Sequence, residues 1–117
     1  MDSEEIKEEL DAKRARELIA SEGCQALDLR TLDDWAEAHI AGAVRVDEGD
    51  VEGALESLSP DQPVVVVCAD GTQSAEVAAD LRERGFEAGI LRGGMKSWSS
   101  AGLPTQPREA EEFKGPS

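Results

Sequence analysis

Several residue types are scarce in this chain of 117 residues, and each scarcity argues against a class of function. The chain has only two Cys and one His, which are too few for a structural zinc site. A membrane-spanning helix needs about 20 apolar residues in a row, and no run approaches that length. Nothing at the N-terminus resembles a signal peptide. We therefore expect a cytoplasmic protein without a bound metal, in which Cys24 and Cys68 stay reduced.

Basic residues are also scarce, since 12 Lys and Arg stand against 26 Asp and Glu and the net charge is -14. Nucleic acids and anionic membranes are bound by basic surfaces, so neither is an expected partner. The acidic residues are spread along the whole chain. This distribution is typical of a salt-adapted, halophile-type surface, although an ordinary acidic protein is the alternative. So much like charge on a small domain also favours a monomer.

The hydrophobic pattern predicts helices and strands in alternation. Helices are expected at 12–21, 31–38, 50–58, 74–84 and 95–102, with Asp11, Thr31 and Asp50 as N-caps of the first three. Strands are expected at 24–30, 44–46, 64–67 and within 86–94. In the fourth helix, Ala75, Val77, Ala78 and Leu81 are expected to point inward. Such alternation predicts an α/β domain with a parallel sheet and helices on both faces.

The most informative segment is a run of four valines, 64–67, that ends at Cys68. In parallel sheets ligands bind at the carboxyl ends of the strands, where this cysteine lies. The loop that follows can curl so that its N–H groups converge near the start of the next helix, and Gly71 permits a positive φ there. A thiol exposed at the rim of such a loop is stabilised as a nucleophilic thiolate. The loop alone fits a small buried cysteine equally well.

Four motifs, one of which includes Cys68, occur together in the order and at the spacing that characterise a known family. They are Asp-x-Arg at 28–30, His-Ile-x-Gly-Ala at 39–43, Cys-x-x-Gly-x-x-Ser at 68–74, and Gly-Gly, Trp and Gly-Leu-Pro across 93–104. In these motifs the chain resembles the rhodanese homology domain over roughly residues 5–104. The resemblance implies a three-layer domain with a central parallel five-stranded sheet over 1–104. The Pro-rich and acidic composition of residues 105–117 predicts a loose tail.

The resemblance also implies an activity, namely sulfur transfer through a persulfide on Cys68. A small-molecule or protein donor would supply the sulfur, a thiol or other acceptor would receive it, and no metal or organic cofactor would take part. The persulfide would be stabilised by the loop, which consists of Ala69, Asp70, Gly71, Thr72, Gln73 and Ser74. The residues that match structural positions of the family are Asp28, Arg30, His39 and Gly42.

The loop departs from the pattern of many relatives because it has no Arg or Lys. Phosphatases and arsenate reductases of related fold use Cys-x5-Arg. Here Gln73 and Ser74 occupy the fifth and sixth positions after Cys68, so the arginine is absent in either register and oxyanion chemistry of that kind is disfavoured. Asp70 repels anionic donors such as thiosulfate. Arg92, after the last expected strand, is predicted to reach the cleft rim and supply a positive charge. The alternative function is a non-catalytic binding or regulatory module that docks a partner at the Cys68 cleft.

Overall fold

The computed structural model describes residues 9–21, 23–47, 50–70 and 73–107. The five strands are β1 Glu9–Leu10, β2 Gln25–Asp28, β3 Val44–Arg45, β4 Val64–Val67 and β5 Ala88–Leu91, and the helices are α1 Ala12–Ser21, α2 Leu32–Glu37, α3 Val51–Ser57, α4 Ser74–Glu83 and α5 Gly94–Ser100. Neighbouring strands all pair in parallel, in the order β1-β5-β4-β2-β3. The predicted α/β fold with a five-stranded parallel sheet is therefore confirmed. None of these helices is long and apolar enough to cross a membrane.

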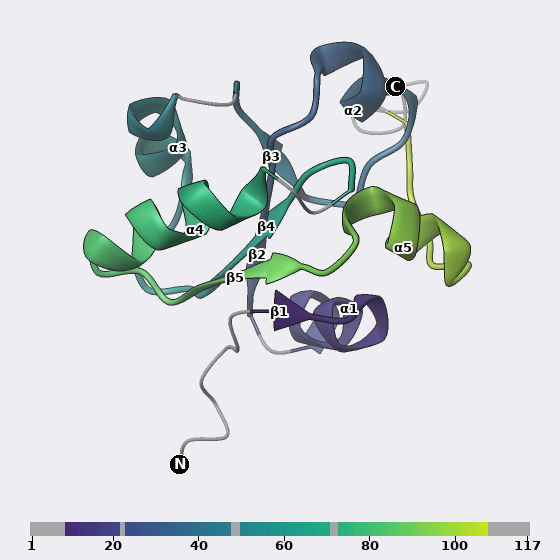
Figure 1. Cartoon of the computed structure of the whole chain (residues 1–117), viewed down its shortest axis with the longest axis horizontal. Coiled ribbons are helices and arrows are strands. Elements are labelled where there is room, and N and C mark those ends of the chain that lie inside the picture. Colours follow the sequence, from purple (N-terminus) through teal and green to yellow (C-terminus); the bar gives the residue numbers. More distant parts are fainter. Residues whose placement is uncertain (1–8, 22, 48–49, 71–72, 108–117) are drawn as a thin grey trace, which may run out of the picture.

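The sheet lies between two helical layers, with α1 and α5 over one face and α3 and α4 over the other (Figure 1). The central strand β4 contributes to both layers because successive side chains of a strand point to opposite faces. Val65 and Val67 pack with the α1 and α5 layer. Val64, Val66 and Cys68 pack with the α3 and α4 layer. All four valines are fully buried, as the unbroken apolar run predicts.

Side-chain caps begin the first three helices where the sequence predicts them. The Arg14 N–H donates to the Asp11 carboxylate over 2.8 Å. The Asp34 N–H donates to the Thr31 hydroxyl over 3.1 Å, and the carboxylate of Asp50 likewise accepts from the N–H of Gly53. Each cap satisfies a backbone donor that has no partner within its helix, and so defines where the helix starts.

The buried face of α4 differs from the prediction at one position. Ala75 is exposed, and Ser74 is buried in its place. The helix begins at Ser74, so the residues that face the sheet follow the spacing i, i+3, i+4, i+7 from there: Ser74, Val77, Ala78 and Leu81. The expectation that Ala75 points inward was therefore wrong, and a serine lies at the apolar interface instead.

The segment after α5 remains attached to the domain beyond the predicted boundary at residue 104. The Trp98 indole N–H donates to the Pro104 carbonyl over 2.9 Å. Gln106 and His39 exchange two backbone hydrogen bonds of 2.9 and 2.8 Å, which form an isolated antiparallel bridge. The first part of the expected loose tail is thus paired with the domain, and residues 108–117 lie outside the described part of the chain.

Candidate functional site

Cys68 follows directly after β4, at the carboxyl end of the central strand. Its side chain continues the alternation of Val64 and Val66 and packs in the same apolar cluster as Val77 of α4. Only 1% of Cys68 is exposed. The sequence-based expectation of an exposed thiol is therefore wrong. The thiol is buried in the apolar cluster on the α4 side, because the pleat of β4 directs it there.

The carbonyl groups of Cys68 and Ala69 are bound by the start of α5. The Met95 N–H donates to the Cys68 carbonyl over 2.9 Å, and the Lys96 N–H donates to the Ala69 carbonyl over 3.1 Å. In a trans peptide the C=O and the following N–H point in opposite directions. The N–H groups of Ala69 and Asp70 are therefore turned away from α5. Two loop residues, Gly71 and Thr72, lie outside the described residues.

Gly94 is what allows α5 to approach the loop this closely. Its φ is +62°, and a Cβ built on it would overlap the Cys68 carbonyl oxygen and lie 2.6 Å from the Ala69 carbonyl carbon. The backbone of Cys68 and Ala69 leaves no room for a side chain. Gly94 is the second glycine of the Gly-Gly motif found in the sequence. A glycine is needed there because the backbone of α5 contacts the backbone of Cys68 and Ala69.

Replacing Gly94 by Ala is expected to destabilise the fold by about 2–3 kcal/mol, because it combines a left-handed φ with overpacking against the loop backbone. The Gly102→Ala variant is the matched control, since Gly102 has a φ of +73° but nothing lies within 4 Å of the position that a Cβ would take there. That control should lose only about 1 kcal/mol. Urea unfolding of both variants checks the difference. Equal losses would show that the contact between Gly94 and the Cys68 loop imposes no constraint.

Asp28 and Arg30, at the end of β2, form a buried ion pair. The Arg30 Nη2 lies 2.9 Å from the Asp28 Oδ2, and the Arg30 Nε lies 3.1 Å from its Oδ1. The Asp28 side chain is 1% exposed and that of Arg30 is 10% exposed. Arg30 also donates to the carbonyl of Ala38 over 2.7 Å. The pair therefore joins the end of β2 to the segment after α2.

The other two predicted structural residues lie in the turn that follows α2. His39 is fully buried and stacks on the Trp35 ring at a centroid distance of 4.0 Å, and its Nδ1 lies 2.7 Å from the Trp35 carbonyl oxygen. Gly42 has a φ of +82°, a conformation that lets the chain turn back toward β3. Neither residue lines the cleft beside Cys68 that is described below.

The end of the loop supplies a buried hydroxyl group. Ser74 is fully buried, and its Oγ makes no hydrogen bond with the described part of the chain. Buried hydroxyls without a partner are unfavourable and call for an explanation. Gln73, just before it, is exposed and makes no side-chain cap to α4. Of these two predicted loop residues, only Ser74 therefore presents a polar atom to the interior.

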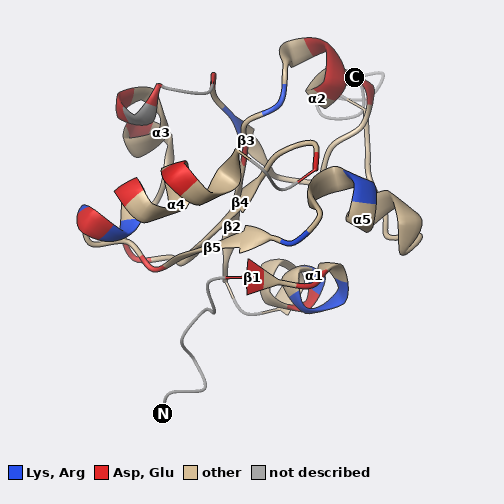
Figure 2. Ribbon diagram, viewed as in Figure 1, with Lys and Arg blue, Asp and Glu red and all other residues tan. Residues whose placement is uncertain are grey.

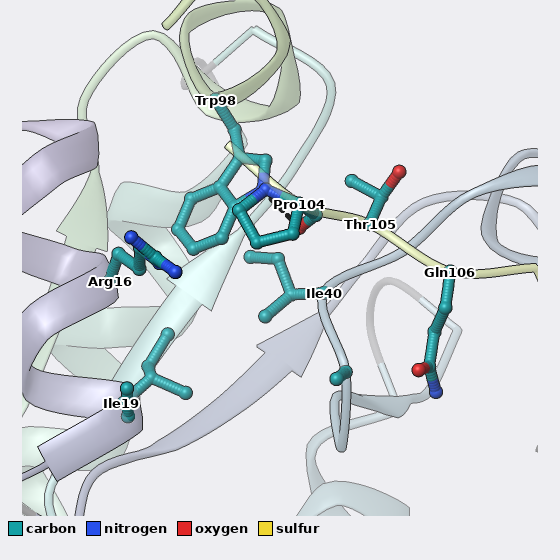
Figure 3. A pocket seen from close by; sticks show the side chains of 9 residues that line it. Arg16, Ile19, Ile40, Trp98, Pro104, Thr105 and Gln106 are labelled. Carbon is teal, nitrogen blue, oxygen red and sulfur yellow. Dashed lines mark hydrogen bonds between the residues drawn. The ribbon is translucent and has the colours of Figure 1, made fainter. Parts of the chain in front are cut away.

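One cavity of about 300 Å³ lies away from Cys68, between α1, α5 and the segment after α5. Figure 3 shows Ile19, Ile40 and the Trp98 indole around it, with Arg16 at its edge. Its lining is largely apolar and, among the described residues, contains no thiol, acid or histidine. This cavity therefore offers no group for nucleophilic or acid–base chemistry.

A second cleft, of about 440 Å³, borders the Cys68 loop through Ala69. It is lined by Arg30, Asp34, Ala69, Met95, Lys96, Ser99 and Ser100. Figure 2 shows the acidic helix α2 and one basic segment on α5, the two helices that contribute most of this lining. Of the residues singled out from the sequence, the cleft brings together Arg30 and Ala69. The sequence reasoning missed Lys96 and Asp34 as lining residues.

Arg92 does not line this cleft. Its Nε lies 3.2 Å from the Glu9 carboxylate of β1, and its side chain is 64% exposed. The positive charge beside the Ala69 end of the loop comes from Lys96 instead. The Gly93 and Gly94 pair in the sequence could have indicated the position of Lys96. Gly94 contacts the backbone of Cys68 and Ala69, and this contact brings the following residues of α5 beside the loop. Within the described residues, no group of three or more His, Cys, Asp or Glu could hold a metal ion.

Comparisons with known proteins agree on one family. The model of the Rhodanese-like domain matches residues 11–101. YtwF of Bacillus subtilis, which carries a provisional sulfurtransferase name, is 33% identical over 100 residues, or 86% of this chain and 97% of YtwF. The thiosulfate sulfurtransferase GlpE of Actinobacillus pleuropneumoniae is 30% identical over 99 residues, covering 84% of this chain and 92% of GlpE.

A solved structure supports the same fold. The crystal structure of a rhodanese-related protein from Thermoplasma volcanium is 24% identical and superimposes with a TM-score of 0.77, covering 86% of this chain and 98% of that one. Together with the family model and the relatives of similar length, this likeness identifies the chain as a member of the rhodanese-like domain family.

Proposed function

We propose that this protein is a sulfurtransferase that moves sulfane sulfur from a donor to a thiophilic acceptor through a persulfide on Cys68. The observation that carries the proposal is the position of Cys68, which directly follows the central strand and whose carbonyl, like that of Ala69, is bound by α5. Two relatives that are similar over most of their length bear sulfurtransferase names, which supports the same chemistry.

The proposed reaction has two displacement steps. In the first, the Cys68 thiolate attacks the outer sulfur of the donor, and the donor's remaining group leaves with the electron pair of the broken bond. In the second, an acceptor thiolate attacks the outer sulfur of the Cys68 persulfide, and Cys68 leaves as the thiolate. The transferred sulfur does not change its oxidation state, so neither step requires an external oxidant or reductant.

The loop has to stabilise the negative charge, because a buried sulfur anion is unfavourable without hydrogen bonds. We assign this task to the loop's backbone N–H groups, among them those of Ala69 and Asp70, which point away from α5. Backbone N–H groups stabilise an anion without the help of a cationic side chain. This is a reason why the loop can lack Arg and Lys.

The second candidate is a binding or regulatory module that docks a partner at the same cleft without transferring sulfur. The burial of Cys68, at 1% exposure, favours this alternative, because a sulfur donor has to contact the thiol. In either case we propose a cytoplasmic monomer that does not bind nucleic acid, in keeping with a net charge of -14.

Intact-protein mass spectrometry separates the two candidates. The protein is incubated with thiosulfate or with a low-molecular-weight persulfide, and the small molecules are removed before measurement. A sulfurtransferase gains the mass of one sulfur atom, and the gain disappears after treatment with a reducing thiol. A mass that stays unchanged with every donor would instead support the binding module.

Replacing Ser74 by Ala is expected to lower the rate of sulfur loading about tenfold, because we assign its buried hydroxyl to the sulfur bound on Cys68. Stability should stay the same or rise slightly, because the variant removes a buried hydroxyl that makes no hydrogen bond with the described residues. Loading kinetics and urea unfolding measure the two effects. The Ser21→Ala variant, at the exposed end of α1, is the control. Unchanged loading in Ser74→Ala would remove this role.

A further inference from the structure

The cleft beside Ala69 contains two charged side chains of opposite sign that make no ion pair with each other. Lys96 and Asp34 are both exposed and both line the cleft. Among the described residues neither forms a salt bridge, and the carboxylate of Asp34 accepts no hydrogen bond. Arg30, the third charged residue, is already paired with Asp28 over 2.9 Å. The cleft therefore presents one available positive and one available negative group.

The net charge of the protein restricts which ligands suit such a cleft. At -14, the molecule as a whole repels anions, and a small dianion has no compensating pair of cations at this site. A ligand that carries one positive and one negative group has no net charge and is not repelled. Such a ligand can form an ion pair with both Lys96 and Asp34. A purely anionic ligand is repelled by Asp34, and a purely cationic ligand is repelled by Lys96.

The burial of Cys68 restricts the shape of a reacting ligand. Cys68 is 1% exposed, and the cleft adjoins its loop through Ala69. A sulfur with so little exposure is poorly accessible to the surface of a bulky folded partner. A short, unbranched arm that ends in sulfur suits this access better, while the charged end of the ligand remains in the wider cleft between α2 and α5.

We propose that the acceptor is a low-molecular-weight amino-acid thiol, whose carboxylate is bound by Lys96 and whose ammonium group is bound by Asp34. This inference rests on the proposed function. The acceptor thiolate attacks the outer sulfur of the Cys68 persulfide, a new S–S bond forms, the bond to the Cys68 Sγ breaks, and Cys68 leaves as the thiolate. The outer sulfur keeps its proton, so the acceptor departs as its persulfide.

Four small thiols test the proposal because they carry the two charges separately and together. Cysteine has an ammonium and a carboxylate, cysteamine only the ammonium, 3-mercaptopropionate only the carboxylate, and 2-mercaptoethanol neither. Each thiol is mixed with protein already loaded with sulfur, and the rate of sulfur loss is followed by intact mass. For each thiol the rate with a variant is divided by the rate with the unmodified protein, so that differences in intrinsic thiol reactivity cancel.

Lys96→Gln is expected to slow cysteine and 3-mercaptopropionate about threefold or more and to leave the other two thiols unchanged. Asp34→Asn should slow the reactions of cysteine and cysteamine by a similar factor and leave those of 3-mercaptopropionate and 2-mercaptoethanol unchanged. Lys13→Gln on α1 and Asp33→Asn beside Asp34 make the same changes of charge outside the cleft and should give equal ratios for all four thiols.

The same experiment separates failure of this inference from failure of the proposed function. Equal ratios for all four thiols in both Lys96→Gln and Asp34→Asn would overturn the zwitterion site while sulfur transfer remains. Ratios that match those of Lys13→Gln and Asp33→Asn would reduce the effect to net charge, which also overturns it. If the unmodified protein never acquires sulfur, it is the proposed function that fails.

Discussion

Replacing Cys68 by Ser is expected to reduce sulfur transfer by about a thousandfold or more, to the uncatalysed background. A serine hydroxyl is not ionised near neutral pH and cannot hold the transferred sulfur as a persulfide. The substitution changes the side-chain volume little, so the fold should persist. Cyanide-dependent and thiol-dependent sulfur transfer, together with intact mass after donor treatment, measure the loss.

Two further variants test whether the loss of activity is due to the sulfur of Cys68 and not to a damaged fold. Cys68→Ala removes the sulfur without adding a buried hydroxyl, and it should be as inactive as Cys68→Ser. Cys24→Ser is the matched control, because Cys24 is also buried but packs in the α1 and α5 layer. It should still gain one sulfur. Full activity in both Cys68 variants, or loss of loading only in Cys24→Ser, would show that Cys68 is not the carrier.

Breaking the Asp28 and Arg30 pair is expected to destabilise the fold by about 3–5 kcal/mol for either single Ala variant, because each leaves a buried charge unpaired. The double Ala variant removes both charges and should lose less than the sum of the single losses. A double-mutant cycle from urea unfolding is expected to give a coupling of about 2 kcal/mol or more.

The exposed pair Arg14 and Glu17 provides a control with a similar separation. Its N–O distance is also 2.9 Å, but its side chains are 45% and 66% exposed. The corresponding cycle should give about 0.5 kcal/mol or less, because water screens the charges and the freely moving side chains lose entropy. Similar couplings for the two pairs would mean that burial does not determine the strength of the Asp28 and Arg30 interaction.

Much of the architecture could be predicted from the sequence because local features specify it. Asp11, Thr31 and Asp50 cap helices near the predicted starts. The valine run forms the central strand because an unbroken β-branched segment is suited to burial on both faces. The error at Ala75 has a simple origin. The helix starts at Ser74 as predicted, but neighbouring residues of a helix lie about 100° apart around its axis, and the sheet covers the side of Ser74 and not that of Ala75.

Two features of the candidate site could not be predicted in this way. Arg92 was expected at the cleft but pairs with Glu9 on the neighbouring strand, because β1 lies beside β5 in the sheet. Cys68 was expected to be exposed, and the pleat of β4 buries it against the α4 layer. Both outcomes depend on contacts between segments that are distant in the sequence.

The sequence by itself determined the order of helices and strands, the family motifs and the identity of the cysteine at the end of the central strand. These follow from local periodicity, capping and motif spacing. Only the tertiary structure decided which side chains surround that cysteine's loop. The backbone of α5 comes within hydrogen-bonding distance of the loop because Gly94 has no side chain, and this contact places Lys96, together with Asp34, in the cleft beside Ala69.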